Sequence, residues 1–279
     1  MSYAAYMPVS RYWADLRWRD FERLDMRAAI AVLPVAAIEQ HGPHLPVGVD
    51  AMINDGYFFR AIEAVPADLP VLFLPGQRIG VSLEHTEFPG TLTLSVETAI
   101  AAWGEIGDSV ARAGCRKLLV MNSHGGNNAA IDAALLKLRS RWRMLAVHAS
   151  WKRLGYPDNL FSSRETAHGV HAGDSETSLM LALRPETVAM DEARDFVSAA
   201  EAMERDFSLL RGKPPLGFAW MASDLGTDGA VGEAGHASAE KGEAAIAYGI
   251  ERFIALLRDI DAFDLARLAT GPLSGDVQK

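Results

Sequence analysis

The sequence predicts an α/β protein with a mostly parallel central sheet. Four short apolar runs, at residues 29–37, 71–74, 117–121 and 145–149, have the length and composition of buried strands. Segments with helical spacing lie between them, and a glycine-rich turn links the third run to a helix. This order of strand, turn and helix is typical of parallel strands joined by right-handed crossovers.

The helices are predicted from apolar residues that recur every three or four positions. In residues 95–114, Ala99, Trp103, Ile106 and Val110 would share one helix face, and Ser95 is a good N-cap residue. The same spacing predicts further helices at residues 10–24, 51–65, 128–141, 168–183 and 238–258. Residues 152–167 and 211–237 show no regular period, so we expect loops there.

Composition limits the classes of protein to be considered. The chain has 279 residues, 49% of them hydrophobic and 23% charged, which suits a globular protein with a substantial core. We see no repeat or linker and expect residues 1–279 to form a single domain. The formal charge of −9 argues against nucleic acid as a partner. A single cysteine excludes a disulfide within the chain, and no apolar run approaches the ~20 residues of a membrane span. We expect a cytoplasmic protein that binds neither nucleic acid nor a membrane.

Residues 39–50 form the most informative loop. Glu39, His41 and Asp50 are all good metal ligands, and they follow the first predicted strand. Two prolines, at positions 43 and 46, exclude a helix through this segment. The plainer alternative is that these side chains are solvated or cap a helix, and this loop alone leaves that alternative open.

Later loops add more residues of the same kind. In an open α/β sheet, the loops at the carboxyl ends of the strands build the binding site. Glu176 and Asp174 also suit the first turn of a helix, where a carboxylate interacts favourably with the helix dipole, and this is their structural alternative. The later loops contain Ser82, Glu84, His85, His124, Gly125, His171, Asp174 and Glu176. A set of imidazoles and carboxylates suits Zn²⁺, Mn²⁺ or Fe²⁺, and five such ligands are enough for two ions.

At this point the sequence resembles the creatininase family. The resemblance is carried by four motifs in the family's order: residues 39–46 with Asp50, residues 82–91, residues 122–127, and residues 171–178. It extends over about residues 10–257. The resemblance implies a three-layer α/β/α fold, a pair of divalent metal ions, hydrolysis of an amide or cyclic amide, and a homo-oligomer, often a hexamer.

The resemblance also implies roles for individual residues. Glu39, His41, Asp50 and His124 match the family's metal ligands, with Asp50 bridging the two ions. His171 matches the histidine that handles protons, and Ser82 and Gly125 match positions that contact the substrate. We expect Glu84, His85 and Asp174 to shape the substrate pocket, or to orient the metal ligands through hydrogen bonds without binding the metal themselves.

Two departures from the motifs change the expected substrate. Creatininase itself has a metal-binding glutamate where this chain has Gly126, and a glutamate where this chain has Val170. These differences argue against creatinine as the substrate. We expect Glu176 to supply the missing carboxylate at the second ion.

The sequence therefore predicts a divalent-metal-dependent hydrolase of a small molecule. A metal-activated hydroxide would attack an amide carbon in a formamide, a cyclic amide or a peptide-like C–N bond, with His171 and Glu176 as catalytic residues. One alternative is a hydrolase of a lactone, a cyclic diketone or a sugar-derived ring on the same site. Another is a binding protein without activity. A serine hydrolase is disfavoured because the sequence has no G-x-S-x-G motif.

Overall fold

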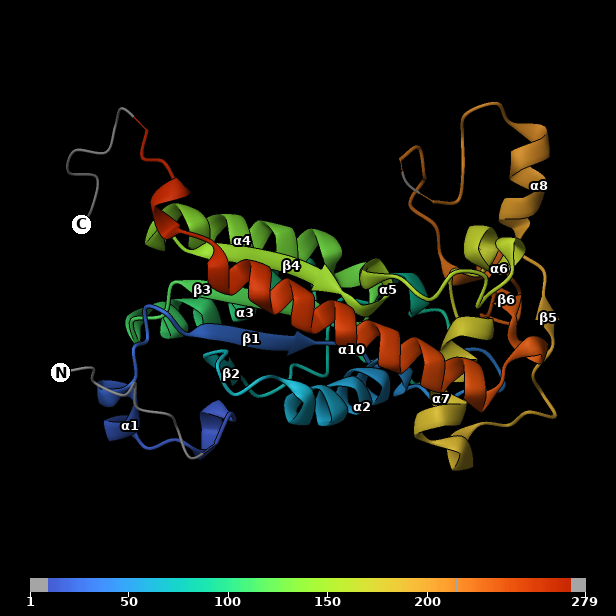
Figure 1. Ribbon diagram of the computed structural model, residues 1–279. Helices are drawn as coiled ribbons and strands as arrows, with labels where there is room; N and C mark the ends of the chain where they lie inside the picture. The colour runs from blue at the N-terminus through green and yellow to red at the C-terminus, as the bar shows by residue number, and fades with distance from the viewer. Residues whose placement is uncertain (1–9, 214, 272–279) are drawn as a thin grey trace.

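A four-stranded parallel sheet lies at the centre of the protein. The computed structural model describes residues 10–213 and 215–271 (Figure 1). The strands follow the order β2-β1-β3-β4. Ile30 of β1 pairs with Val71 of β2 on one side and with Lys117 of β3 on the other. Their bounds are Ile30–Val35 for β1, Val71–Phe73 for β2, Lys117–Asn122 for β3 and Leu145–Ser150 for β4.

Helices cover both faces of this sheet. Successive side chains of β1 point to opposite faces, as in any strand: Ile30 and Val32 belong to one apolar cluster, and Ala31 and Leu33 to another. The first cluster is closed by α2 (Val49–Ala64), α7 (Asp174–Leu183) and α10 (Ala239–Ala262), and the second by α3 (Val96–Arg112) and α4 (Asn128–Trp142). The predicted three-layer α/β/α fold is confirmed.

Shorter elements lie around this frame. A two-stranded antiparallel sheet forms from β5 (Asp195–Phe196) and β6 (Gly232–Glu233). It lies beyond the carboxyl ends of the central strands, on the same side as α6 and α7 (Figure 1). The short helices are α1 (Trp18–Arg23), α5 (Trp151–Leu154), α6 (Ser163–His168), α8 (Ala199–Asp206) and α9 (Ala222–Leu225).

Some predicted elements were wrong in detail. Residues 10–24 form a 3₁₀ turn and α1, separated at Leu16 and Arg17, rather than one helix. Neither piece contains a buried residue, so packing does not hold a continuous helix together here. Residues 152–167 are not all loop, because α5 and α6 begin at the serine caps Ser150 and Ser162. Residues 211–237 likewise contain α9 and β6.

The start of α7 also differs from the prediction. The helix begins at Asp174 and not at residue 168. Ala172 has a φ of 56°, in the left-handed region, so the chain turns sharply just before the helix. Among the helices of residues 10–213 and 215–271, none combines the length and the apolar character that crossing a bilayer requires.

The contact between α10 and α7 gives a prediction about stability. A Cβ placed on Gly242 of α10 would lie 2.0 Å from the carbonyl oxygen of Ser178 in α7. Gly242→Ala should therefore lower the free energy of unfolding by about 1–3 kcal/mol through overpacking. Urea unfolding followed by circular dichroism measures this change.

Gly104 in α3 is the matched control, because a Cβ there would meet nothing within 4 Å. Gly104→Ala should raise the free energy of unfolding by up to about 1 kcal/mol, the difference in helix propensity. Equal effects at the two positions would contradict the packing explanation.

Candidate metal centre

Four predicted ligands meet at the carboxyl ends of the central strands. Glu39 and His41 follow β1, His124 follows β3, and Asp50 lies in the first turn of α2. Glu39 and His41 are 1% exposed, Asp50 is 2% and His124 is 6%. A parallel sheet brings the ends of its strands to one edge, so segments far apart in the sequence form one buried polar cluster.

Two of the three groups of donor atoms that the described residues form in the cluster share Asp50. Glu39, Asp50 and His124 form one group and His41, Asp50 and Glu176 the other, each with its donor atoms within 4.8 Å of one another. In the first group, His124 Nδ1 lies 3.1 Å from Glu39 Oε2 and 3.6 Å from Asp50 Oδ2. In the second, His41 Nε2 lies 3.9 Å from Asp50 Oδ1 and 3.8 Å from Glu176 Oε2. Asp50 thus offers one oxygen to each group.

Two donor atoms in the cluster lack a hydrogen-bond partner. Among the residues that the structure describes, these atoms are His41 Nε2 and Asp50 Oδ2, and both are buried. Buried polar atoms are nearly always satisfied, and a cation bound at these two atoms would satisfy both. His41 Nδ1 lies 3.0 Å from the Glu39 carbonyl oxygen, which makes Nδ1 the protonated nitrogen and leaves a lone pair on Nε2.

The same reasoning assigns the tautomer of His124. Its Nε2 donates to the carbonyl oxygen of Val81 at 2.9 Å, so in the neutral ring the lone pair is on Nδ1, which faces Glu39 and Asp50. Fixing one ring nitrogen by a hydrogen bond is the usual way in which proteins orient a metal-binding histidine. The donor set therefore fits a divalent-metal site.

Burial and crowding shift the pKa values of these groups in opposite directions. Burial, reinforced by the charge of Glu39, raises the pKa of Asp50 well above its usual value. Burial also acts to raise the pKa of Glu39, but the neighbouring imidazoles, His124 first, bring it well below the usual value. Burial acts to lower the pKa of His124, and the carboxylates of Glu39 and Asp50 outweigh it. Two carboxylates this close favour a positive charge between them.

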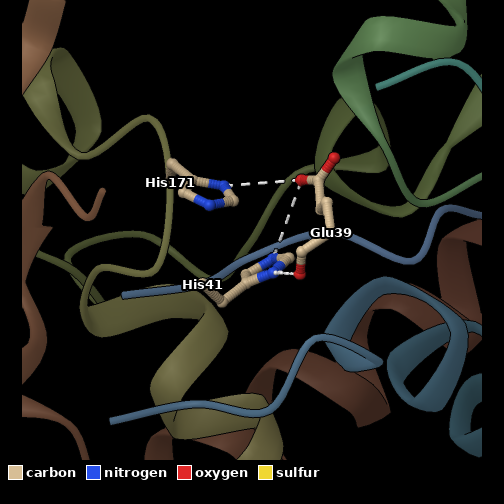
Figure 2. A group of neighbouring side chains, drawn as sticks. All are labelled: Glu39, His41 and His171. Carbon is tan, nitrogen blue, oxygen red and sulfur yellow. Dashed lines mark hydrogen bonds and ion pairs between the residues drawn. The ribbon is translucent and has the colours of Figure 1, made fainter. Parts of the chain in front are cut away.

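His171 lies beside this cluster. Its Nε2 donates to the carbonyl oxygen of Gln40 at 2.6 Å, and its Nδ1 lies 3.6 Å from Glu39 Oε1. Figure 2 shows His171 and His41 on the same side of the Glu39 carboxylate. Burial, together with His41 and His85, brings the pKa of His171 well below its usual value. A third group of potential metal donors contains Glu39, His41 and His171, so geometry allows His171 as a ligand or as a proton carrier.

Ser82, Glu84 and His85 lie around the ligands. Ser82 is fully buried, and its hydroxyl donates to Glu39 Oε2 at 2.6 Å. His85 accepts a hydrogen bond from Gln40 through Nδ1 and directs Nε2 toward Glu39 Oε1 at 3.5 Å. Both residues contact Glu39 and hold its carboxylate in place. Glu84 Oε1 lies 3.4 Å from His124 Nε2, and its side chain is partly exposed.

Three other predicted residues occupy different situations. Glu176 Oε2 accepts a hydrogen bond from the backbone N–H of Ala172 at 2.6 Å and also belongs to the second donor group. Gly125 is exposed, with open space where a Cβ would point. The carboxylate of Asp174 accepts from Ser178 and pairs with Lys241, so these contacts give Asp174 a structural role in α7.

Two residues that connect the loops were missed in the sequence. Asn127 accepts from the N–H of Val81 and donates to the carbonyl of Ala36 and to Asn122, so it holds three loops together. The Gln40 amide contacts His85 and donates to the Gly229 carbonyl at 2.8 Å. Both lie inside the recognised motifs, but amides that bond to distant backbone give no periodic signal.

The departure at Gly126 has a clear structural counterpart. A Cβ at this position would lie 2.4 Å from Glu84 Oε1 and 2.4 Å from His124 Nε2. The place where a side chain would start is therefore already filled by Glu84. The carboxylate of Glu176 lies elsewhere, with Oε2 3.8 Å from His41 Nε2.

Comparisons with known proteins agree with this geometry. The family model for creatininase (creatinine amidohydrolase) matches residues 14–257. Creatinine amidohydrolase from Pseudomonas putida is 32% identical over 211 residues, which are 68% of this chain and 78% of the relative. The mycofactocin precursor peptide peptidase of Mycolicibacterium smegmatis is 33% identical over 172 residues, 61% of this chain. That match covers 64% of the peptidase, which is less than two thirds of its length.

Solved structures show the same similarity. A manganese form of creatininase superposes with a TM-score of 0.73 at 25% identity, over 91% of this chain and all of the other. A creatininase variant of the Zn–Zn type superposes with a TM-score of 0.71 at 26% identity, over 92% of this chain and all of the other. The chain therefore belongs to the creatininase family of hydrolases.

Proposed function

We propose that this protein uses two divalent cations to hydrolyse an amide-type C–N bond in a small molecule or a peptide. The observation that carries the proposal is that Asp50 is shared between two three-residue donor groups. One cation would be held by Glu39, Asp50 and His124, and the other by His41, Asp50 and Glu176. Such a pair of cations, when bound, polarises a carbonyl and lowers the pKa of water.

The chain's own residues supply the remaining functions. Glu39 is held by Ser82, and His124 by the carbonyl of Val81, so both ligands are oriented before any cation binds. His171 has one ring nitrogen fixed by Gln40, which leaves Nδ1 to hold or release a proton beside Glu39. That arrangement suits a proton carrier, which accepts a proton on Nδ1 and passes it to the leaving nitrogen.

The class of substrate is proposed from the relatives and from position 126. The peptidase and the creatinine amidohydrolase both support cleavage of a C–N bond. Because Gly126 replaces a carboxylate of creatininase, we favour a formamide, a cyclic amide or a peptide over creatinine. A second candidate is a ring ketone or lactone, since a 3-dehydro-scyllo-inosose hydrolase from Thermotoga maritima is 23% identical over 91% of this chain.

A substrate screen tests this choice. Purified protein loaded with Mn²⁺ or Zn²⁺ is incubated with panels of formamides, cyclic amides, short peptides, lactones and cyclic ketones. Release of amine or carboxylate from the first three panels supports the proposal. Turnover of lactones or ketones alone would favour the second candidate, and binding of cations without turnover on any panel would favour a non-catalytic protein.

The two donor groups predict different losses of metal. Asp50→Asn should abolish binding of both cations, because Asp50 belongs to both groups. Glu176→Gln should weaken only one of them, by on the order of 10–100-fold, as is usual for perturbed metal shells. Elemental analysis of purified protein gives the number of ions per chain.

Asp55→Asn is the matched control for Asp50. Asp55 lies on the same helix, α2, but is exposed and pairs with Arg78. The control should retain both cations. A Glu176→Gln protein with unchanged metal content would remove Glu176 from the proposed site.

His171→Asn separates the two roles that geometry allows for His171. As a proton carrier, its loss should lower kcat by about 10²–10⁴-fold and leave the metal content unchanged. As a ligand, its loss would release metal. Elemental analysis and steady-state kinetics on the same preparation decide between the two roles.

A further inference from the structure

A buried carboxylate outside the metal centre holds together the segment that carries His171 and Glu176. Glu165, in α6, is 3% exposed. Its Oε1 accepts a hydrogen bond from the backbone N–H of Ser175 at 3.2 Å, and its Oε2 accepts one from the N–H of Glu233 at 2.8 Å. One side chain therefore links three segments of the chain: α6, the start of α7, and β6.

Three glycines enclose this carboxylate. A Cβ at Gly169 would lie 2.3 Å from its Cδ, one at Gly173 would lie 2.4 Å from Oε1, and one at Gly232 would lie 2.7 Å from Oε2. Any side chain at these positions would displace the carboxylate. The close fit indicates a site built around the charge and shape of Glu165.

The contact with Ser175 makes Glu165 a cap for α7. The N-cap residue of this helix is Gly173, which has no side chain to accept from the first-turn N–H groups. Glu165 supplies that acceptor from another helix. Next to Ser175, Glu176 reaches back to the N–H of Ala172, whose φ of 56° is in the left-handed region.

The other side of the same segment is held through β6. The backbone N–H of Val231 donates to the carbonyl of His171 at 2.9 Å, just before Gly232 and Glu233. Glu165 therefore holds the stretch from His171 to Ser175 at both ends: directly at Ser175, and indirectly at His171 through its bond to β6. Glu39 and His124, in contrast, are held by Ser82 and Val81, neither of which is among the partners of Glu165.

We propose that Glu165 is a positioning residue that places Glu176 for the second cation. This inference rests on the proposed two-cation site. Replacing the carboxylate by an amide would turn an NH₂ group toward one of the two N–H donors, and the start of α7 would shift. The cation held by His41, Asp50 and Glu176 would then bind more weakly, and the cation held by Glu39, Asp50 and His124 would not.

The experiment is a titration of metal-free protein with Mn²⁺, followed by calorimetry and electron paramagnetic resonance. Wild type should bind two ions with the signature of a coupled pair. Glu165→Gln should keep the first ion and weaken the second by on the order of 10–100-fold, with loss of the coupled signature. Glu201→Gln is the matched control: Glu201 contacts Arg164, the neighbour of Glu165 in α6, and the variant should behave as wild type.

Gly169→Ala provides a second variant if Glu165→Gln does not fold. Its Cβ would press on the Glu165 carboxylate, so it should weaken the same single cation. Unchanged binding of both ions in a folded variant, or equal loss of both, would overturn the role of Glu165. A wild-type protein that binds fewer than two ions would instead refute the proposed two-cation site, and this result is visible before any variant is made.

Discussion

The structure depends on the close approach of Glu39 and Asp50, two buried carboxylates that share one imidazole neighbour, His124. Burying a single unpaired carboxylate is costly, and burying two side by side adds their repulsion. The imidazoles compensate in part, which explains why the pKa of Glu39 falls while the pKa of Asp50 rises. Cations between the carboxylates would offset both the burial and the repulsion.

The parallel sheet makes this close approach possible. Its two central strands, β1 and β3, end side by side, and their loops deliver Glu39, His41 and His124 to one place. Asp50 comes from the N-terminus of α2, where the helix dipole favours a carboxylate. The amide of Asn127 then connects the loops through the backbone of Val81 and Ala36 and the side chain of Asn122.

The fold and the candidate ligands were predicted from different features of the sequence. The strands were found because buried parallel strands are continuous apolar runs, and β1 to β4 differ from the predicted runs only at their ends. Glu39, His41, Asp50 and His124, which meet in the cluster, were predicted as ligands because their motifs combine metal-binding side chains with glycine and proline.

Other features have no local signature in the sequence. α5 and α6 are too short to show a period, and only their serine caps mark them. Gln40 and Glu165 act on backbone groups that are distant in the sequence, so their roles follow from the packed structure alone. Ser82 lies in a recognised motif, yet its hydrogen bond to Glu39 becomes visible only in the folded structure.

The crowding at Gly126 couples two positions of the site. A glutamate introduced at position 126 would meet Glu84, the ring of His124 and the carbonyl oxygen of Val81. Glu84 or the backbone around it would have to move to admit the new side chain. Epistasis between positions 84 and 126 follows from this crowding, so the effect of a carboxylate at one position depends on the residue at the other.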